Sequence, residues 1–496
     1  MVDLETLRAT QFGAWVAENE LDLLGNYFVE TAQWQGILAG NVDVIYGPKG
    51  AGKSALYSLL IKSAALLRER GIVVVNAENP RGAPAFEYLD EDPPSTERDF
   101  ISMWKLYFAS LVAEAIYENG NRSGALGRVL SQLEDAGLRR GGLSLRVVLR
   151  NVSQYIKSLT RVESIEASET VDAGTGVPVL TQKITIREPN SAESHAGKVS
   201  IDSLLDTLEQ SLAETGLSAW ILLDRLDVAF NDNEALEENA LRALFRAYRD
   251  LSDKPHLGLK IFLRSDIWQR ITSQGFREAS HITKTTNITW DKAGLVNLVI
   301  RRALANAALC KHYGANREEI LESYSTQEAF FDRLFPPQID LGERKPSTID
   351  WMLTRVQDGT AQPAPRELIH LLNASLAVQI RKAERGESSD DGDVLLSRAA
   401  LKEGLAEVSK VRLEQTIYAE YPNLKPFIEL LREEKTAQSL ESLAKLWNLG
   451  PEEAGAVASK LVKIGFFEAR EPKTDPEFWV PFLYRSALDM VQGTAD

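Results

Sequence analysis

The segment from Val42 to Ser54 constrains the fold of this chain more strongly than any other part of the sequence. It reads Val-Asp-Val-Ile-Tyr-Gly-Pro-Lys-Gly-Ala-Gly-Lys-Ser, so an apolar run leads into the pattern G-x-x-x-x-G-K-S. Ala55–Leu60 then continues with the character of a helix. A strand, a glycine-rich loop and a helix in this order form the context that a phosphate-binding loop requires.

Each part of this loop has a role in holding a nucleoside triphosphate. The glycines let the backbone curl until successive N–H groups point at an anion, and the N-terminus of the following helix adds partial positive charge. Lys53 can reach the β- and γ-phosphates, and the Ser54 hydroxyl can ligate Mg²⁺. The sequence therefore predicts binding of ATP with Mg²⁺. The expected contact residues are Tyr46, Gly47, Pro48, Lys49, Gly50, Ala51, Gly52, Lys53 and Ser54.

Composition limits the class of protein. With 496 residues the chain is long enough for roughly two to four domains. The single cysteine, Cys310, excludes a disulfide framework and a cysteine-based zinc site, and it fits a reducing cytoplasm. The N-terminus lacks the features of a secretory signal, and no apolar run approaches the roughly 20 residues of a membrane span. A net charge of −15 argues against broad adhesion to nucleic acid or anionic lipid.

The best candidate for a magnesium carboxylate is Asp224, which ends the apolar run Ser218–Leu223. A buried strand that ends in an acid can hold Mg²⁺ beside Ser54. Many ATPases place a water-polarising acid next to this residue, but here the next residue is Arg225. Asp227 lies three residues after Asp224 and is the first candidate for the catalytic base.

Two other strand ends offer further candidates. Glu78 ends the apolar strand Gly71–Ala77 and is a rival base, although it could equally be the first solvated residue of a loop. Leu257–Leu263 reads as a third strand, followed by Arg264, Ser265 and Asp266. Ser265 or Arg264 could contact the γ-phosphate or the attacking water; Ser265 and Asp266 could instead cap the next helix.

Together these motifs resemble the AAA+/STAND branch of P-loop ATPases, and more narrowly a group of bacterial ATPases with origin-recognition-like architecture. The segments that carry the resemblance are Tyr27–Thr31, Gly47–Ser54, Leu223–Asp227, Leu263–Asp266, Asn287–Trp290 and Gly359–Ile369. The resemblance implies that Arg366 starts the lid helix and reaches back to the γ-phosphate. It also implies an arginine finger acting across a subunit boundary, for which Arg277 is the better candidate and the arginines of Leu241–Arg249 are the alternative.

The remainder of the chain adds an insertion and a C-terminal domain. Residues 120–200 read as a family-specific insertion, with an exposed strand at Thr181–Arg187 and a basic stretch between Asp135 and Glu163. Gln438–Trp447 and Pro451–Ile464 form a helix–turn–helix pattern, followed by a two-stranded wing. Residues 437–496 carry more acidic than basic side chains, which favours contact with protein over DNA.

The predicted fold is α/β: a P-loop NTPase parallel sheet with helices on both faces, a helical lid and a C-terminal winged-helix domain. The expected domains are residues 1–290, 291–383 and 394–496. The leading function is an Mg²⁺-dependent ATPase that acts as a conformational switch or assembly engine, as a homo-oligomer or with a separate effector protein. The resemblance also points to phage defence. The alternatives are an ATP-holding oligomerisation scaffold with negligible turnover and a DNA-binding initiator or loader.

Overall fold

The computed structural model describes most of the chain and divides it into two compact units. One unit comprises Ala32–Gly47 and Lys53–Asn287, and the other comprises Met1–Thr31, Pro48–Gly52 and Ile288–Asp496. The residues outside the description are 1, 17–19, 21–23, 26, 79–85, 87–88, 90–91, 95, 140–143, 161–166, 172–177, 183–199, 227–232, 274–275, 388–390, 471–476 and 496. Only the backbone is described at 159–160, 167–171, 178–182, 234 and 277–278.

A parallel sheet of five strands forms the centre of the first unit, in the order β2-β5-β6-β1-β7. Its strands are β1 (Val44–Gly47), β2 (Ile72–Asn76), β5 (Ser218–Leu223), β6 (Leu257–Arg264) and β7 (Thr285–Asn287). β5 and β6 are buried along almost their whole length, as expected for parallel strands covered on both faces. β6 therefore lies between the strand that leads into the P-loop and the strand that ends before Asp224, as in P-loop ATPases with an inserted strand.

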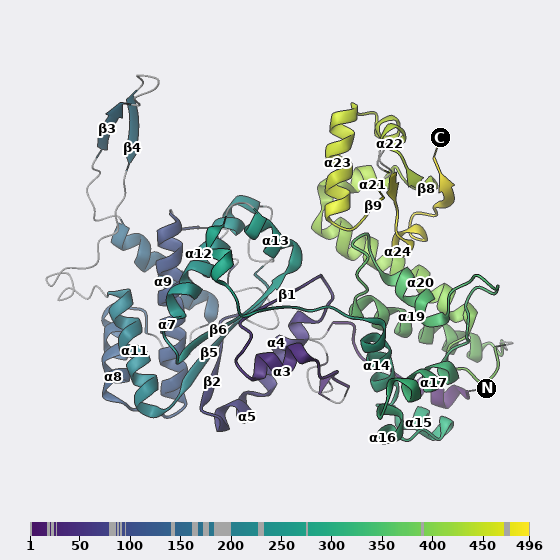
Figure 1. Cartoon of the computed structure of the whole chain (residues 1–496), viewed down its shortest axis with the longest axis horizontal. Helices are drawn as coiled ribbons and strands as arrows, with labels where there is room; N and C mark the ends of the chain where they lie inside the picture. Colours follow the sequence, from purple (N-terminus) through teal and green to yellow (C-terminus); the bar gives the residue numbers. More distant parts are fainter. Residues whose placement is uncertain are drawn as a thin grey trace. The chain divides into compact units, whose positions relative to one another are not determined.

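Helices cover both faces of this sheet. Figure 1 shows α3 and α4 on one side of the strands and α7, α11 and α12 on the other. The long helix α7 buries Trp104 and Tyr107 against the sheet and begins at a capping box formed by Thr96 and Asp99. The helices of this unit are α3 (Ala32–Leu38), α4 (Lys53–Lys62), α5 (Ala64–Glu69), α7 (Glu97–Glu118), α8 (Gly124–Asp135), α9 (Leu145–Thr160), α11 (Ile201–Thr215), α12 (Glu234–Leu251), α13 (Ser265–Ser273) and the 3₁₀ turn η3 (Arg277–His281).

The expected insertion contains α8, α9 and a two-stranded antiparallel sheet of β3 (Ala167–Val171) and β4 (Pro178–Gln182). The strand predicted at Thr181–Arg187 overlaps β4 at its first two residues, and residues 183–187 lie outside the described residues. The basic stretch includes α9, whose apolar residues Leu149, Val152 and Ile156 are buried in the core of this unit.

The second unit begins with a helical region that contains the predicted lid. α19 starts at Pro365, which is favourable at the first turn because its missing N–H would have had no partner there. The helices are α1 (Leu4–Ala9), α14 (Lys292–Ala303), α15 (Ala307–Tyr313), α16 (Arg317–Leu321), α17 (Tyr324–Leu334), α18 (Thr348–Val356), α19 (Pro365–Glu384), α20 (Arg398–Arg412), the π-helical turn η4 (Leu413–Tyr418), the 3₁₀ turn η5 (Pro422–Leu424) and α21 (Lys425–Glu429).

A winged helix follows in the same unit. α22 (Leu440–Trp447) and α23 (Pro451–Lys463) pack together, and Asn448 adopts φ +53° in the turn between them. The sheet order is β11-β8-β10-β9, in which β9 and β10 form the antiparallel wing. The strands are β8 (Lys435–Gln438), β9 (Glu468–Arg470), β10 (Glu477–Trp479) and β11 (Val491–Thr494), and the short helix α24 (Phe482–Arg485) follows the wing.

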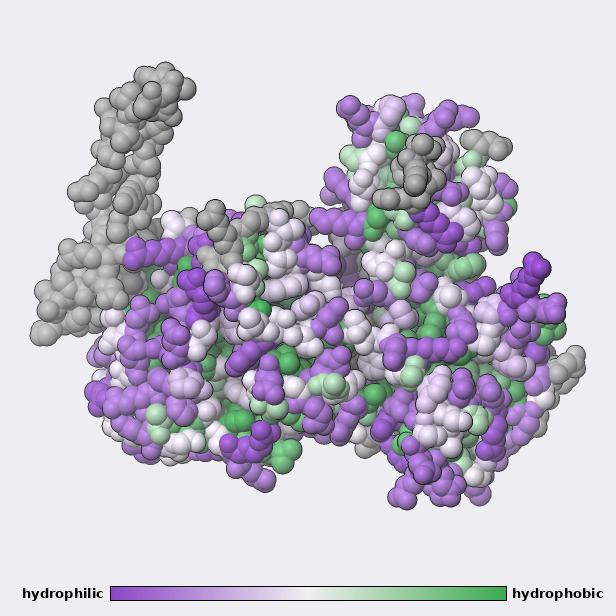
Figure 2. All heavy atoms as spheres, in the orientation of Figure 1, coloured by the Kyte–Doolittle hydropathy of each residue, from purple (hydrophilic) through white to green (hydrophobic). Residues whose placement is uncertain are grey.

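Few large apolar side chains are exposed. Figure 2 shows a mainly hydrophilic face on which hydrophobic residues are scattered. The exposed large apolar residues among those described are Trp15, Leu66, Tyr324, Leu341, Leu430 and Val491. Within the described chain no single helix is long and apolar enough to cross a membrane, although the bent pair α14 and α15 passes such a test on length and composition alone.

Candidate nucleotide-binding site

The P-loop connects the central strand β1 to α4. Gly50 and Gly52 adopt φ values of +81° and +101°, which side-chain-bearing residues rarely adopt, so the loop needs glycine at both positions. Lys53 is the first residue of α4, and its Nζ donates to the carbonyl oxygen of Gly47 over 2.8 Å. Ser54 follows in the first turn of α4. The predicted strand, loop and helix are confirmed, and they place the lysine ammonium across the loop.

The tip of the loop, Pro48–Gly52, packs with the unit that contains the lid helices. The indole Nε1 of Trp290 donates to the carbonyl oxygen of Ala51 over 2.8 Å. Lys49 forms an ion pair with Glu420, which follows η4. A Cβ atom on Gly50 would lie 3.0 Å from Glu367 Oε2 and 3.1 Å from the Cβ of Arg366. The tip is therefore held by residues that lie more than 230 positions later in the sequence.

Arg366, the predicted sensor, lies in the first turn of α19. Its backbone is placed beside Gly50 by the close approach described above, so the structure brings this residue to the tip of the P-loop. The side chain of Arg277 lies outside the described atoms, although its backbone belongs to η3. Two of the three alternative finger candidates on α12 are engaged in ion pairs: Arg242 pairs with Glu238, and Arg246 Nη1 lies 2.7 Å from Glu97 Oε1.

Asp224 directly follows β5 and is 5% exposed. The next residue, Arg225, has φ +57°, a value that is uncommon for a residue other than glycine. This backbone turn places an arginine where many ATPases carry a second acid. Asp227, the first candidate for the base, lies outside the described residues.

Glu78, the rival base, is completely buried, so the interpretation of this residue as the start of a solvated loop is wrong. Its carbonyl oxygen accepts a hydrogen bond from the Tyr57 hydroxyl over 2.7 Å, and the preceding carbonyl, of Ala77, accepts one from Tyr107 over 2.9 Å. Burial raises the pKa of the Tyr57 hydroxyl above its ordinary value, and the charges of Asp224 and Glu78 raise it further. Tyr57 of α4 is therefore electrostatically coupled to both acids.

Unpartnered oxygens lie at the carboxyl ends of neighbouring strands. Within the described part of the chain, Ser265 Oγ and Asn287 Oδ1 are buried and have no hydrogen-bond partner. Ser265 follows β6 and Asn287 is the last residue of β7, so both lie at the carboxyl ends of the two strands that flank β1. The register places Asn287 opposite Tyr46, directly before the P-loop. Buried polar atoms without partners are uncommon and are often explained by an absent ligand or water.

These findings correct and extend the predictions for this edge of the sheet. Ser265 does not cap α13, since its hydroxyl makes no hydrogen bond among the described residues. Arg264 binds Asp266 through two hydrogen bonds of 3.1 and 2.9 Å. Sequence reasoning did not identify Asn287 as a site residue; its only signal was a polar residue at the end of a short strand. Tyr46 lies within β1 and stacks against Trp268, with 5.7 Å between ring centroids.

The residues present fit a magnesium nucleotide. Gly50 and Gly52 have positive φ, a Cβ atom on Gly52 would meet nothing within 4 Å, and the orphaned oxygens of Ser265 and Asn287 supply polar atoms at the same edge. No group of three or more His, Cys, Asp or Glu side chains that could hold a metal occurs among the described residues. A site with only one or two protein ligands suits Mg²⁺, which proteins bind together with substrate phosphates. Ser54 and Asp224 are the residues that would hold it.

Comparisons with known proteins give distant structural neighbours. Neither the comparison with protein-family models nor that with curated proteins finds a match. Among solved structures, the chain is similar to the Aeropyrum pernix ORC1 protein in complex with DNA, with 12% identity over 92% of this chain and 91% of that one and a TM-score of 0.39. It is also similar to Cdc6p from Pyrobaculum aerophilum, with 12% identity, coverage of 98% and 97% and a TM-score of 0.32. At these scores the fold assignment rests on the strand order and on the position of the P-loop.

Proposed function

We propose that this protein is an Mg²⁺-dependent ATPase that acts as a conformational switch or assembly engine for a partner protein. The observation that supports this most strongly is the P-loop on the central strand β1, with Lys53 and Ser54 at the start of α4. Asp224 ends a strand of the same sheet, and orphaned oxygens lie at the carboxyl ends of the strands on either side of β1. The resemblance of the sequence to bacterial ATPases that work beside separate effectors suggests a role such as phage defence.

Different residues of this chain would bind the nucleotide and promote its hydrolysis. The amides of the loop and Lys53 would bind the phosphates, and Ser54 and Asp224 would hold Mg²⁺, which neutralises charge on the transferred phosphoryl group. Asn287 and Ser265 offer polar atoms for the γ-phosphate or the attacking water. Asp227 or Glu78 would orient that water. Glu78 is buried and coupled to Tyr57, which suits a base shielded from bulk solvent.

The tip of the loop provides the route to a change in conformation. Arg366 and Glu367 begin α19 and lie against Gly50. Phosphates bound in the loop would attract Arg366 and repel Glu367, so gain or loss of the γ-phosphate changes the balance of forces on the first turn of α19. We therefore infer that α19 transmits the state of the nucleotide to the residues packed around it.

Steady-state ATP hydrolysis by the purified protein, compared with Lys53→Ala and with Asp227→Asn and Glu78→Gln tested separately, checks this proposal. We expect Lys53→Ala to lose both binding and turnover, and one of the two acid variants to keep ATP binding while losing turnover. Wild-type protein that fails to bind ATP at millimolar concentrations would contradict the proposal. Binding should be measured separately by equilibrium dialysis, so that loss of binding and loss of chemistry are distinguished.

The position of Arg225 favours a second candidate, an ATP-holding oligomerisation scaffold with negligible turnover. It removes the acid that commonly follows the magnesium carboxylate. In that case wild-type turnover would equal that of Lys53→Ala while ATP binding remained. Sedimentation with and without ATP then reports whether the nucleotide drives assembly.

A cluster of arginines next to the wing supports a third candidate, a DNA-binding initiator or loader. Arg355 and Arg485 lie over the ring of Phe482 at 4.4 and 3.9 Å, and Arg470 lies over Trp479 at 4.0 Å. Burial, followed by the charges of Arg355 and Arg470, lowers the pKa of Arg485 to about 10, so a bound anion would relieve this repulsion.

The exposed acids Glu452 and Glu453 at the start of α23 oppose binding of a phosphate backbone by that helix. A gel-shift series over salt concentration, with Arg470→Ala as the variant, separates the DNA-binding candidate from the other two. DNA binding that weakens with salt and with this substitution would favour it.

A further inference from the structure

The edge strand β2 presents backbone groups that have no partner in the described structure. Among the described residues β2 pairs with β5 alone, and the amide of Ala77 and the carbonyl of Gly71 bond to β5 residues. Because N–H and C=O groups alternate in direction along a parallel strand, those of Ile72, Val74 and Asn76 point to the other side. No hydrogen bond to these outward groups occurs among the described residues. A free strand edge is a template for pairing with another chain.

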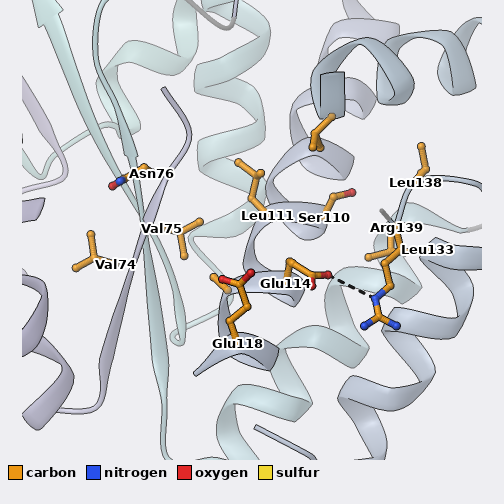
Figure 3. Close-up of a pocket in the computed structure, with 12 residues that line it drawn as sticks. Val74, Val75, Asn76, Ser110, Leu111, Glu114, Glu118, Leu133, Leu138 and Arg139 are labelled. Carbon is orange, nitrogen blue, oxygen red and sulfur yellow. Dashed lines mark hydrogen bonds and ion pairs between the residues drawn. The ribbon is translucent and has the colours of Figure 1, made fainter. Parts of the chain in front are cut away.

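A cavity of about 310 Å³ lies alongside this edge. Figure 3 shows that Val75 points toward the Glu118 side of the strand, whereas the side chains of Val74 and Asn76 point away from it. Val74 and Asn76 therefore line the cavity with their backbones. The opposite wall comes from α7, through Ser110, Leu111 and residues one and two turns later, and from the segment after α8. Side chains of α7 and of the segment after α8 therefore face a space that adjoins the edge of β2.

The charged groups of this wall are two carboxylates and one guanidinium. Arg139 Nε lies 3.4 Å from Glu114 Oε2, and the same guanidinium lies over the ring of Tyr117, so its charge is engaged. Glu118 is exposed one turn after Glu114 and forms no ion pair with any described residue. The cavity therefore offers one carboxylate that a basic side chain can satisfy.

We propose that an extended, basic segment of a partner protein binds here by adding a strand to the free edge of β2. Its backbone would pair with Ile72, Val74 and Asn76, and a Lys or Arg side chain would enter the cavity and bind Glu118. The proposed occupant is a different protein rather than a second copy, because two chains that each carry a net charge of −15 repel one another. Strand addition provides affinity through the backbone and specificity through alternate side chains. This proposal does not depend on nucleotide binding.

The test uses an array of octapeptides, each with a single central Lys or Arg in a background of Val and Thr, together with counterparts in which Gln replaces the base. Binding to the full-length protein is measured by fluorescence anisotropy. We expect a subset of the basic peptides to bind and their Gln counterparts to bind about tenfold more weakly. N-methylation of the peptide amides that face β2 should abolish binding. Methylation of the alternate amides, which face away from β2, should preserve it.

Two substitutions locate the site. Val74→Pro removes an outward N–H without removing a bond to β5, which is the position on an edge strand where proline is tolerated; Val74→Thr keeps the N–H and is its matched control. Glu118→Gln at the exposed end of α7 is matched by Glu214→Gln on α11. We expect Val74→Pro and Glu118→Gln to weaken binding about tenfold and the controls to bind as wild type. The proposal is overturned if no basic peptide binds, if Glu118→Gln binds the selected peptides as wild type does, or if a folded Val74→Pro does so.

Discussion

The Glu367 carboxylate and the Arg412 guanidinium form a buried ion pair, with 2.9 Å between Oε1 and Nη1 and less than a tenth of either side chain exposed. Burial alone lowers the pKa of Arg412, but the charges of Glu367, Tyr484 and Asp358 outweigh it and raise the pKa. The other carboxylate oxygen, Oε2, is the atom nearest to a Cβ built on Gly50, and it has no hydrogen-bond partner among the described residues. The end of α20 is therefore linked through Glu367 to the tip of the P-loop.

Removal of one member of this pair should destabilise the unit that contains it. Arg412→Met leaves the Glu367 charge buried and unpaired, which costs about 3–5 kcal/mol in comparable sites. Chemical unfolding would measure the loss. The double variant Glu367→Gln with Arg412→Met should recover much of the stability, because it removes both charges. A loss of less than about 1 kcal/mol for Arg412→Met would show that the pair is not important for stability.

Substitutions at Ser265 and Asn287 should weaken ATP binding without lowering the stability of the protein. Asn287→Leu and Ser265→Ala remove buried polar atoms that have no partner in the described structure, and an unsatisfied buried group costs about 1–3 kcal/mol. We expect the variants without nucleotide to unfold at the same temperature as wild type or higher. Stabilisation by ATP, measured as the shift of the melting temperature, should fall.

A melting temperature that falls without nucleotide while the ATP shift persists would assign both residues a structural role instead. Thr285→Ala, in the same short strand β7, is the matched control and should change neither quantity by much.

His370 predicts a specific dependence of stability on pH. Its ring stacks on Trp15, with 4.4 Å between centroids, and burial followed by the Arg366 charge lowers its pKa below 6.5, while Glu407 acts in the opposite direction. The unfolded chain therefore binds a proton more readily than the folded chain. The contribution of His370 to the free energy of unfolding is therefore fully present above pH 6.5 and is lost as the pH falls through the lowered pKa. The loss in melting temperature between pH 8 and pH 5 should be smaller for His370→Phe, which keeps the stacked ring, than for wild type.

Removal of magnesium should separate the roles of Asp224 and Lys53. With EDTA we expect wild type to keep weak ATP binding and to lose hydrolysis, because Ser54 and Asp224 then have no ion to hold. Asp224→Asn should behave in Mg²⁺ as wild type does in EDTA, whereas Lys53→Ala should bind poorly in both conditions. Equilibrium dialysis and phosphate release measure the two quantities. Full activity of Asp224→Asn in Mg²⁺ would remove this residue from the metal site.

Local patterns were sufficient to predict the elements that carry the site. The glycine spacing, the buried strand before Asp224 and the Pro365 start of α19 are confirmed, because each depends on backbone geometry or burial within one segment. The helix–turn–helix is also confirmed at α22 and α23, and the two-stranded wing at β9 and β10. The second strand of the wing is short, because β10 ends at Trp479 and α24 begins at Phe482, directly after Pro481.

Contacts between distant segments could not be read from the sequence. Nothing local distinguishes Asn287 from any polar residue after a strand, because its significance comes from the register that sets it opposite Tyr46. Glu367 likewise reads as an ordinary acid in the first turn of a helix until Gly50 and Arg412 are found beside it. The roles assigned to Asp227 and Arg277 remain predictions.

The packing of Pro48–Gly52 with residues after Ile288 has a practical consequence for dissecting this protein. A fragment that ends at Asn287 would retain the P-loop and the predicted magnesium residues, including Lys53, Ser54 and Asp224. It would lack the indole that bonds to Ala51 and the helix start that faces Gly50. Such a truncation would expose the loop's tip on its packed side, so low affinity in the fragment would reflect the loss of these distant residues and not a change in the P-loop sequence. We therefore expect nucleotide affinity to depend on residues after Ile288 as well as on the P-loop itself.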